Sequence, residues 1–307
     1  MKILITEFME DVSVEILKTS FEVKVDLGLS TNTSDLKKII SQFDVLIVRN
    51  KTQVNQEVLE KASNLKFIGR LGVGLDNIDT EYCKNNNIHV QPATGMNADS
   101  VAEYVINVSL SLLKNISLIH KETSIGNWPR TSILSRELKG KTIGLLGFGL
   151  IAKKVSILAK IFNAEIIAYD PFIESSIGDE FDTSLVDINK IFELSDIISI
   201  HIPLTETTKN LLDYNAFKKM VKTPIIINSS RGSIINEEDL LRAYNENIIS
   251  GFALDVYESE PVTKNFLKKI KDNTNCILTP HIAGVTRESN SRVSEFIANA
   301  VKDFFKL

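Results

Sequence analysis

The stretch Thr142–Asp170, TIGLLGFGLIAKKVSILAKIFNAEIIAYD, combines a β-branched run, a glycine turn, an amphipathic helical pattern and a second apolar run. This order predicts the strand–helix–strand unit that binds a dinucleotide. Gly147 would permit the tight turn, and Gly149 would let the backbone approach a pyrophosphate at the N-terminus of the helix. Ala152 stands where such motifs have a third glycine, and a small residue is sufficient there. The predicted pyrophosphate site comprises Gly147, Phe148, Gly149, Leu150 and Ile151.

Asp170 ends the second apolar run, about 20 residues beyond Gly147, where such units place the acid that binds the adenosine ribose. A carboxylate accepts hydrogen bonds from ribose hydroxyls but repels a 2′-phosphate. The next residues, Pro171-Phe172-Ile173, supply no cation for such a phosphate. The sequence therefore predicts NAD rather than NADP as the cofactor. The alternative is that Asp170 is an ordinary turn aspartate before a proline.

Composition limits the class of protein. A chain of 307 residues, with 43% hydrophobic and 24% charged residues, is typical of a soluble globular protein with two domains. The net charge of −4 argues against nucleic acid or an anionic membrane as a partner. The N-terminus, MKILITEF, lacks an apolar signal core, and no run approaches the about 18 apolar residues that cross a membrane. Since Cys83 and Cys276 show no metal-ligand spacing, we expect a cytoplasmic protein without a metal site.

Short β-branched runs alternate with helical patterns along the chain, which is typical of α/β proteins with parallel sheets. The runs are too numerous for one open sheet, so we expect two sheets. The strands predicted in the first third are Lys2–Thr6, Glu22–Asp26, Asp44–Val48, Lys66–Arg70 and Ile88–Gln91. Those predicted in the second part are Thr142–Leu146, Glu165–Tyr169, Asp196–Ile200, Ile225–Asn228, Gly251–Leu254 and Ile277–Thr279.

The predicted domain boundary lies near Asn97–Ser100, where a long helical pattern begins and Asn97 or Asp99 is available as the N-cap. Residues 99–284 are expected to form a Rossmann NAD-binding domain. Residues 1–98 are expected to form a smaller substrate domain, to which the C-terminal segment 285–307, with a helix over Glu288–Phe305, returns. Two crossings between domains would leave a ligand cleft where the strand order reverses.

Three ionisable residues follow predicted strands: Arg231 in NSSRGSII, Glu260 in ALDVYESEP and His281 in LTPHIAG. Each alone could be a loop salt bridge, a solvated acid or a polar residue beside a proline. Together they supply what hydride exchange between nicotinamide and a 2-hydroxy acid requires. An arginine binds the substrate carboxylate with two parallel donors. An imidazole exchanges the hydroxyl proton, and a carboxylate orients that imidazole and stabilises its protonated form.

Over essentially its whole length, the chain resembles the NAD-dependent D-isomer-specific 2-hydroxyacid dehydrogenases. The family has a Rossmann domain and a smaller flavodoxin-like parallel-sheet domain, so this fold is expected here. The matching motifs are GRLGVGLDNID (69–79), NADSVAEY (97–104), GLLGFGLIA (144–152), YDP (169–171), HIPLTETT (201–208), NSSRGSIINEEDL (228–240), ALDVYESEP (253–261) and PHIAG (280–284).

The resemblance implies catalytic roles for the three ionisable residues. Arg231 would bind the substrate carboxylate and carbonyl, His281 would be the acid/base, and Glu260 would pair with His281. Further substrate contacts are implied for Val73 and Gly74, through backbone N–H groups, and for Asn97.

The resemblance also implies cofactor contacts beyond the glycine turn. Asp255 would hold the nicotinamide amide, and Ser229 and Thr208 would line the cofactor groove. His201 matches a residue in the wall of that groove. Ala152, in place of the third glycine, is the one departure from the family pattern.

Within the family, the segments ITEFM, LIVRNKTQV, PATGMNADSVAEYVI and HIAGVTRESN resemble short phosphoglycerate dehydrogenases and, in particular, (S)-sulfolactate dehydrogenases. Both substrates carry a second anionic group. Arg49 ends a predicted strand and Arg70 opens a glycine-rich loop, so both are expected to bind that group. Resemblance to phosphoglycerate enzymes implies that Arg130, in GNWPR, reaches the substrate from a partner subunit. The alternative is that Arg49 and Arg70 only pair with Asp76 or Asp79.

The sequence thus predicts an NAD-dependent D-2-hydroxyacid dehydrogenase, cytoplasmic and homodimeric. Its substrate would be a small acid with a second anion, 3-phosphoglycerate or (S)-3-sulfolactate. The alternatives are a glyoxylate- or hydroxypyruvate-type reductase and an NAD(H)-sensing binding protein that resembles transcriptional corepressors. A formate- or phosphite-oxidising relative is a further alternative, against which the Glu–His pairing argues.

Overall fold

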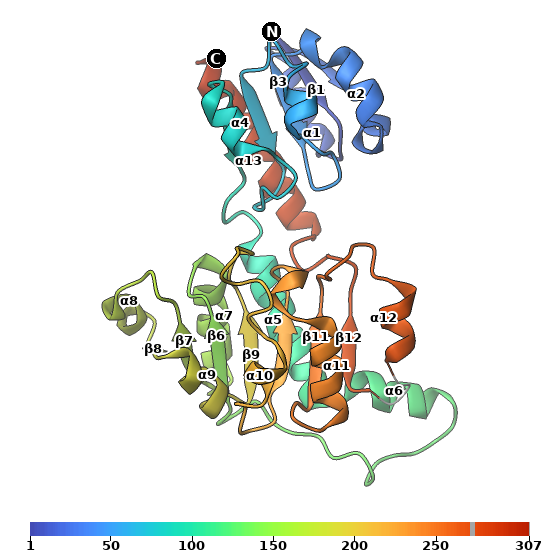
Figure 1. Ribbon diagram of the computed structural model, residues 1–307, viewed down its shortest axis with the longest axis vertical. Helices are drawn as coiled ribbons and strands as arrows, with labels where there is room; N and C mark the ends of the chain where they lie inside the picture. The colour runs from blue at the N-terminus through green and yellow to red at the C-terminus, as the bar shows by residue number, and fades with distance from the viewer. Residues whose placement is uncertain (271–273, 307) are drawn as a thin grey trace. The chain divides into compact units, whose positions relative to one another are not determined.

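The computed structural model describes residues 1–270 and 274–306. The chain divides into two compact units. Unit 1 comprises Met1–Asn97 and Val285–Leu307, and unit 2 comprises Ala98–Gly284. Each unit contains one parallel sheet with helices on both of its faces (Figure 1).

Unit 1 contains a five-stranded parallel sheet in the order β2-β1-β3-β4-β5, which is the flavodoxin-like order. Its strands are β1 (Lys2–Ile5), β2 (Glu22–Val25), β3 (Val45–Val48), β4 (Phe67–Arg70) and β5 (His89–Pro92). Its helices are α1 (Asp11–Lys18), η1 (Leu27–Thr31), α2 (Thr33–Ile39), η2 (Ile40–Gln42), α3 (Gln56–Leu59), α4 (Thr80–Asn85) and α13 (Arg287–Phe305).

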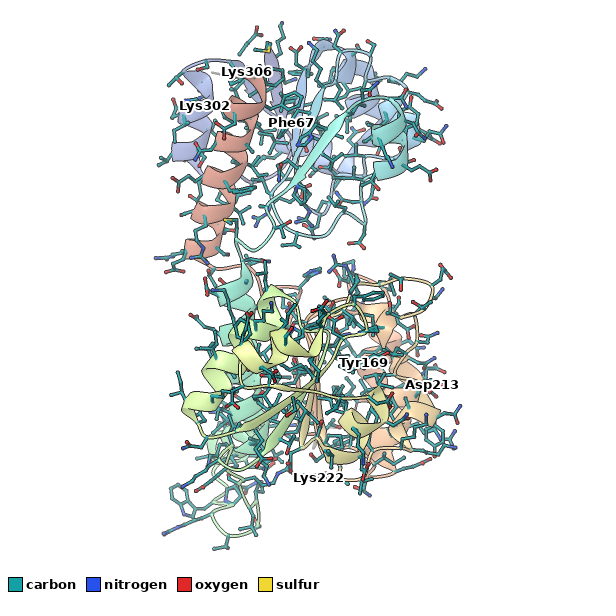
Figure 2. All side chains as sticks on the ribbon, turned by 90° about the vertical axis from the view of Figure 1, so that its left-hand side faces the viewer. Phe67, Tyr169, Asp213, Lys222, Lys302 and Lys306 are labelled. Atoms are coloured by element: carbon teal, nitrogen blue, oxygen red, sulfur yellow. The ribbon has the colours of Figure 1, made fainter. Side chains whose placement is uncertain are left out.

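The two faces of this sheet form separate cores because β1 and β3 are apolar on both sides, as expected for a parallel sheet covered twice. One core joins β1 and β3 to α1 and α13, through residues such as Ile5, Leu17 and Ile297. The rings of Phe67 and Phe304 extend this core, with centroids 5.2 Å apart (Phe67 is labelled in Figure 2). The other core lies against α2, α3 and α4.

Helix α13 begins at Arg287 because a capping box precedes it. Thr286 Oγ1 accepts a hydrogen bond from Ser289 N at 3.0 Å, and Ser289 Oγ accepts one from Thr286 N at 3.0 Å. The apolar side of the helix, with Val293, Ile297 and Val301, is buried in unit 1. The return of the chain after residue 284 thus completes the core of unit 1.

Unit 2 contains a seven-stranded parallel sheet in the order β12-β11-β10-β9-β6-β7-β8. The order contains the Rossmann pattern 3-2-1-4-5-6, with a further strand at the β12 edge. The strands are β6 (Thr142–Leu146), β7 (Glu165–Tyr169), β8 (Ser184–Leu185), β9 (Ile197–Ile200), β10 (Ile225–Asn228), β11 (Gly251–Leu254) and β12 (Cys276–Leu278). The helices are α5 (Ala98–Leu113), α6 (Ile116–Ser124), α7 (Leu150–Ile161), α8 (Ser175–Glu180), α9 (Ile188–Leu194), α10 (Tyr214–Phe217), η3 (Gly232–Ile234), α11 (Glu237–Asn245) and α12 (Lys264–Lys269).

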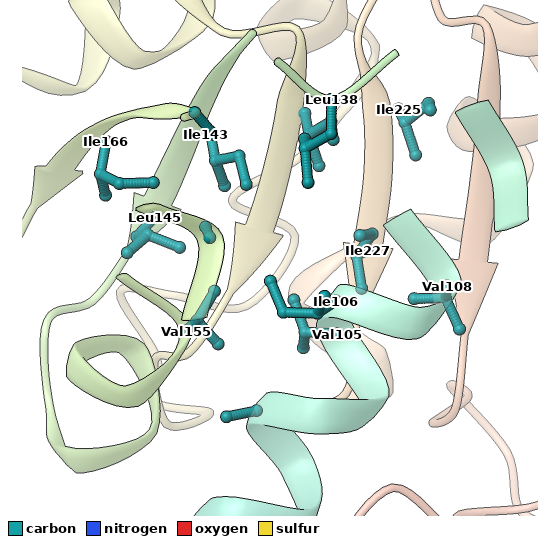
Figure 3. Packing of buried hydrophobic residues seen from close by; sticks show 14 of the residues in the cluster. Val105, Ile106, Val108, Leu138, Ile143, Leu145, Val155, Ile166, Ile225 and Ile227 are labelled. Atoms are coloured by element: carbon teal, nitrogen blue, oxygen red, sulfur yellow. The ribbon is translucent and has the colours of Figure 1, made fainter. Parts of the chain in front are cut away.

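The sheet of unit 2 is packed between two layers of helices. On one face α5 and α7 lie side by side, and Val105 and Val155 pack against Ile143 and Leu145 of β6 (Figure 3). On the other face α9, α10 and α11 cover residues such as Ile226. These buried layers hold the carboxyl ends of the strands at one edge of the sheet.

The α/β fold with two parallel sheets is confirmed, and the predicted strands agree with the observed ones to within a residue at each end. Strand β8 escaped prediction because it has only two residues and no apolar run. The predicted N-cap of α5 is wrong. Asp99 lies inside the first turn and pairs with Lys154 Nζ at 2.5 Å, and Asn97 Oδ1 accepts no hydrogen bond from the described residues.

Candidate active site

The turn after β6 requires glycine at its first position. Gly147 has a φ of +89°, which disfavours any residue with a Cβ. A Cβ there would also lie 2.8 Å from the carbonyl oxygen of His201, which follows the neighbouring strand β9. The turn is therefore pressed against the end of β9, where the strand order reverses.

Gly149 has the opposite environment. Its φ of −78° suits any residue, and a Cβ at this position would have no atom within 4 Å. The packing of the protein therefore does not explain this glycine, whereas a pyrophosphate that approaches the backbone would fill the open space. Gly149 precedes α7 and offers no side-chain cap, so N–H groups of the first turn remain available to an anion. Ala152 is fully buried, as the third position of the motif requires. These residues fit a dinucleotide.

Asp170 links β7 to the glycine turn. Its Oδ2 accepts a hydrogen bond from Phe148 N at 3.0 Å, and its Oδ1 accepts one from Phe172 N at 3.0 Å. Asp170 therefore forms a local turn and also contacts the predicted pyrophosphate site. Each carboxylate oxygen can accept a further hydrogen bond, which leaves capacity for ribose hydroxyls. Phe172, two residues after Asp170, is 93% exposed and carries no charge. It therefore supplies no cation for a 2′-phosphate.

The loop that carries Arg231 is held against the loop after β11. Buried Asn228 Nδ2 donates to Arg231 O at 2.9 Å, and Arg231 Nη1 donates to Ser230 O at 2.7 Å. A Cβ at Gly232 would lie 1.9 Å from the backbone carbonyl of Tyr257, so only glycine permits this approach. Arg231 is thereby fixed beside the segment that leads to Glu260.

Glu260 and His281 are in direct contact. His281 Nδ1 lies 2.8 Å from Glu260 Oε2, and Glu260 Oε1 accepts a hydrogen bond from Tyr257 N at 3.2 Å. Both carboxylate oxygens are therefore engaged, and the imidazole is held through Nδ1. Its Nε2 remains to exchange a proton, since the His281 side chain is 42% exposed. Arg231, Glu260 and His281 follow the adjacent strands β10, β11 and β12.

Asp255 lies at the end of β11 and is 1% exposed. Its carboxylate accepts hydrogen bonds from Thr279 Oγ1 at 2.5 Å, Ile282 N at 2.8 Å and Ala283 N at 2.7 Å. The donors lie on both sides of His281 in the sequence, with Thr279 before it and Ile282 and Ala283 after it. The observed role of Asp255 is to anchor this loop, and its contact with the nicotinamide amide stays a prediction.

The remaining predicted cofactor residues lie after β9 and β10. His201 Nε2 lies 2.9 Å from Ser199 Oγ, and burial lowers the pKa of His201 to about 4, so the ring is neutral near pH 7. Thr208 Oγ1 accepts from Thr205 N and donates to Pro203 O, both at 2.7 Å, and thus shapes its own loop. Ser229 Oγ is buried without a hydrogen-bond partner among the described residues, which leaves it available to a ligand.

Arg49 follows β3 in unit 1 and is held by polar groups. Its Nη2 donates to Asn290 Oδ1 at 2.8 Å. Burial lowers the pKa of Arg49, while the charges of Glu7 and Glu10 act in the opposite direction. Over residues 1–270 and 274–306, no carboxylate lies within ion-pair distance of its guanidinium, so Arg49 does not pair with Asp76 or Asp79.

Glu7 is a site residue that sequence reasoning missed. The buried carboxylate accepts hydrogen bonds from the backbone N–H groups of Arg49, Lys51 and Thr52 at 2.8 to 3.1 Å. It therefore fixes the loop that begins with Arg49. The available signal was an acid just after the first strand, in ITEF, where an apolar residue would be expected in a core.

Arg70 ends β4, and its side chain folds back over the next turn. A Cβ at Gly72 would lie 1.5 Å from Arg70 Nη1, which itself donates to Leu71 O at 3.2 Å. Val73, which is exposed, and Gly74, which is partly exposed, follow Gly72 directly. Asp79, one of the alternative partners of Arg70, accepts a hydrogen bond from Tyr82 N and caps α4. Arg49 follows β3 and Arg70 ends the paired strand β4, so the structure places both at one edge of the sheet of unit 1.

Arg130 stands apart from the other predicted site residues of unit 2. It is exposed and lies in the segment of residues 125–137 that follows α6, where its N–H donates to Trp128 O at 2.9 Å. In Figure 1 this segment lies at the end of unit 2 opposite to the start of α5. The structure of this unit therefore does not bring Arg130 to its own glycine turn.

Asn97, the last residue of the first part of unit 1, is partly buried. Its Oδ1 has no hydrogen-bond partner in the described chain. A buried oxygen without a donor is costly unless a ligand or water supplies one.

Over residues 1–270 and 274–306, no helix is long and apolar enough to cross a membrane. Within the same residues, no group of three or more His, Cys, Asp or Glu side chains could hold a metal ion. Both cysteines are free thiols, and burial raises the pKa of Cys83 and that of Cys276 to about 11.

Comparison with known proteins gives consistent results. Residues 106–283 match the NAD-binding domain of the D-isomer specific 2-hydroxyacid dehydrogenases. The chain is 36% identical to (S)-sulfolactate dehydrogenase of Chromohalobacter salexigens, over 98% of this chain and 97% of that protein. It is 34% identical to D-3-phosphoglycerate dehydrogenase of Synechocystis sp., over 98% of this chain but 54% of the relative. The chain thus spans about half the length of that phosphoglycerate dehydrogenase.

A solved structure is similar over both units. D-lactate dehydrogenase of Aquifex aeolicus, complexed with NAD and lactic acid, superimposes with a TM-score of 0.87 and 28% identity, over 100% of this chain and 96% of that one. With the glycine turn, the acid after β7 and the matching sequences in agreement, the chain belongs to the D-isomer specific 2-hydroxyacid dehydrogenase family and is an NAD-dependent oxidoreductase.

Proposed function

We propose that the chain interconverts a 2-hydroxy acid that carries a second anionic group and the corresponding 2-oxo acid, with His281 as the acid/base. The observation that carries the proposal is the 2.8 Å contact between His281 Nδ1 and Glu260 Oε2. It fixes an imidazole with one nitrogen on a carboxylate and the other available to a substrate hydroxyl. The substrate would be 3-phosphoglycerate or (S)-3-sulfolactate.

The chain would hold NAD through the glycine turn, Asp170 and the residues after β9, β10 and β11. The backbone of Gly147–Ile151 would bind the pyrophosphate, and Asp170 would accept hydrogen bonds from the adenosine ribose. His201, Thr208, Ser229 and Asp255 would complete the groove. The chemistry that the cofactor supplies is transfer of a hydride to or from C2 of the substrate.

His281 would move the proton of the reaction. In the oxidation direction, Nε2 accepts the proton of the C2 hydroxyl while the hydride leaves C2, and the C–O single bond becomes a carbonyl. The imidazolium that forms is stabilised by the Glu260 carboxylate at Nδ1. In the reduction direction, the imidazolium returns a proton to the developing alkoxide. The hydrogen bond from Tyr257 N to Glu260 Oε1 would hold the carboxylate in this orientation during the cycle.

Arg231 would bind the C1 carboxylate and polarise the C2 carbonyl with its planar donor fork. The backbone N–H groups of Val73 and Gly74, and the side chain of Asn97, would bind the same carboxylate. A carboxylate only accepts, so Asn97 would bind it through Nδ2, and its unpartnered Oδ1 would accept a hydrogen bond from a water.

Arg49 and Arg70 would bind the second anion. Arg49 supports this assignment because it is partly buried, oriented by neutral Asn290, and has no carboxylate at ion-pair distance in the described chain. A partly desolvated cation with no carboxylate at ion-pair distance is costly, and a bound phosphate or sulfonate would supply a direct ionic partner. The names of the two relatives above, a sulfolactate and a phosphoglycerate dehydrogenase, are consistent with such a substrate.

The test is a steady-state comparison of 3-phosphoglycerate, (S)-3-sulfolactate, D-lactate and D-glycerate with NAD. One of the two dianionic acids should have a kcat/KM about 100-fold above either monoacid, since one or two charge-assisted hydrogen bonds are worth about 1.5 to 3 kcal/mol each. A preference for glyoxylate or hydroxypyruvate in the reverse direction would make the chain a reductase of that type. Tight NADH binding without turnover of any acid would favour an NAD(H)-sensing role.

We also propose that the protein is a cytoplasmic homodimer that forms through α6 and the segment after it. No residue of α6 is buried, and Ile125, Trp128 and Leu134 are 68 to 79% exposed. Monomers rarely expose several large apolar side chains together. A second copy that covers them would also carry Arg130 to the partner's substrate. Sedimentation of the wild type at the mass of a dimer, and of Trp128→Ser/Leu134→Ser at that of a monomer, would support this assembly.

A further inference from the structure

The backbone of His281 is held in an unfavourable conformation. Its φ is 57°, in the left-handed region that a residue with a Cβ seldom adopts. Such conformations persist when surrounding contacts determine them, and they concentrate at functional sites. The contacts that determine this one therefore bear on how the imidazole is aimed.

Three successive backbone N–H groups donate hydrogen bonds to a single residue, Asp255. His281 N donates to Asp255 O at 2.8 Å, Ile282 N to Asp255 Oδ1 at 2.8 Å, and Ala283 N to Asp255 Oδ2 at 2.7 Å. The loop thus wraps around the buried end of β11. If the Asp255 carboxylate turned, two of the three hydrogen bonds that support the left-handed residue would be lost.

The orientation of Asp255 is set by a further contact. Thr279 Oγ1 lies 2.5 Å from Asp255 Oδ1 and 2.7 Å from the hydroxyl of Tyr104. A carboxylate only accepts, so the single proton of Thr279 is given to Asp255. Tyr104 must therefore donate to Thr279. Burial raises the pKa of Tyr104 to about 12, which keeps this phenol protonated near neutral pH.

The resulting chain of hydrogen bonds runs in one direction, from Tyr104 to Thr279 to Asp255. Tyr104 belongs to α5, which is packed against α7 and buried along its apolar side. The backbone of Thr279 is fixed as well, since Tyr257 Oη donates to Thr279 O at 3.0 Å and Thr279 N donates to Leu254 O at 3.0 Å. The chain of hydrogen bonds therefore connects a long helix that is packed in the core of unit 2 to the loop of His281.

We propose that Tyr104 and Thr279 are positioning residues for His281. Through Asp255 they hold the left-handed backbone that brings Nδ1 onto Glu260 and leaves Nε2 for the substrate. The inference rests on the proposed function in assigning the acid/base role to His281. Neither residue is assigned a contact with substrate or cofactor, and the decisive effect should appear in kcat at saturating NADH, because Asp255 itself is also assigned to the cofactor groove.

The first experiment measures kcat, the KM of NADH and the KM of the oxo acid for Thr279→Val, Thr279→Ser and Tyr104→Phe. Thr279→Val removes the donor to Asp255 and should lower kcat about 100-fold, because a misplacement of about 1 Å is worth that much. Thr279→Ser keeps the hydroxyl and should restore most of kcat. Tyr104→Phe removes one neutral hydrogen bond at the start of the chain and should lower kcat about two- to tenfold. The kcat is measured at saturating NADH, so that any change in the KM of NADH that follows from moving Asp255 does not enter the comparison.

Two matched controls separate positioning from a general loss of stability. Thr183→Val removes a buried threonine hydroxyl that contacts Ser156 Oγ at 2.8 Å near β8. Tyr244→Phe removes a tyrosine hydroxyl that accepts from Asn275 N at 2.9 Å, just before β12. Both changes are chemically the same as the test variants but lie away from the His281 loop, so kcat should remain within about twofold of the wild type.

A second experiment needs no substrate. The chain has four histidines, so 15N-labelled imidazole signals can be assigned by comparison with His281→Ala. At a pH where the ring is neutral, His281 should show the tautomer with its proton on Nδ1, because Glu260 accepts there. In Thr279→Val, the His281 signal should change toward that of a mixture of the two neutral tautomers. In Thr279→Ser, the signal of the Nδ1-protonated tautomer should be retained.

The outcomes distinguish this inference from the proposed function. Wild-type kcat and an unchanged tautomer in Thr279→Val, with turnover lost in His281→Ala, would overturn the positioning role and leave the function intact. Full turnover in His281→Ala would remove the proposed function, and the tautomer measurement would still decide whether Thr279 orients the ring. If Thr279→Val does not fold, Tyr104→Phe decides: a two- to tenfold lower kcat supports the inference, and an unchanged kcat with an unchanged tautomer overturns it.

Discussion

Oε2 of Glu260 lies 2.8 Å from Nδ1 of His281, while Oε1 of the same carboxylate accepts the N–H of Tyr257 at 3.2 Å. The acid is thus anchored at one oxygen and orients the imidazole with the other. Glu260→Gln keeps the shape but replaces the charge by an amide. We expect kcat to fall about 10- to 100-fold, because the imidazolium loses its stabilising carboxylate. The pH profile of kcat should shift as well, and an unchanged profile would show that Glu260 does not act on the reacting proton.

Gly147 and Gly149 should respond differently to alanine. Gly147→Ala places a Cβ 2.8 Å from His201 O at a positive φ, so the thermal midpoint of unfolding should fall by several degrees. Gly149→Ala meets no protein atom within 4 Å and should leave the midpoint unchanged. Its added methyl group should instead weaken NADH binding about tenfold or more, measured by fluorescence titration. Equal NADH affinity in Gly149→Ala and the wild type would place the pyrophosphate elsewhere.

Asp170 should determine the preference between NADH and NADPH. The wild type should have a kcat/KM at least about 100-fold higher for NADH, since a carboxylate repels the 2′-phosphate. Asp170→Ser with Phe172→Arg should reduce this ratio, because the repulsion is removed and a cation is supplied. Phe172→Arg alone is the matched control and should change the ratio less. A wild-type enzyme with equal kcat/KM for the two cofactors would refute the role of Asp170.

Arg49 and Arg70 should select for the second anion. Arg70→Ala and Arg49→Ala should each raise the KM of the dianionic oxo acid about 10- to 100-fold, whereas the KM of glyoxylate or pyruvate should change little. Asn290→Ala removes the partner of the Arg49 guanidinium but not its charge. It should therefore raise the KM of the dianionic oxo acid by less, and should again change the KM of glyoxylate or pyruvate little. Equal losses for dianionic and monoanionic acids would show that these arginines only maintain the loops.

The neutral, partly buried His201 makes the folded state sensitive to acid. Its folded pKa of about 4 is below the ordinary value of about 6.5, so the unfolded chain binds the additional proton between these values. Above pH 6.5 this histidine does not lower the free energy of unfolding, and the free energy of unfolding decreases as the pH falls from 6.5 toward 4. Between pH 6.5 and 5 the free energy of unfolding should therefore decrease by about 1 to 2 kcal/mol more in the wild type than in His201→Gln. Denaturant titrations at both pH values measure this difference, and parallel losses in the two proteins would contradict it.

The sequence predicted the strands well because parallel strands buried on both faces are short continuous apolar runs, such as VLIV at Val45–Val48. It also predicted which side chains follow adjacent strands, since Arg231, Glu260 and His281 each come soon after such a run. β8 could not be predicted because two residues carry no periodic signal.

The supporting groups could not be predicted, because they depend on contacts between distant segments. Glu7 binds the loop of Arg49 across 42 positions in the chain, and Tyr104 meets Thr279 across 175 positions. The N-cap expected at Asn97 failed for a related reason. Its position before a helix suggested a local hydrogen bond, whereas its side-chain oxygen is buried without a donor from the described residues.

The most direct test of the central claim is the turnover of His281→Ala, measured together with its affinity for NADH. The substrate is the oxo acid that the wild type reduces fastest. We predict that kcat falls about 10²- to 10⁴-fold, because general acid/base catalysis is lost, while the dissociation constant of NADH changes less than about threefold. Turnover at the wild-type rate with unchanged NADH binding would contradict the assignment of His281 and, with it, the proposed mechanism.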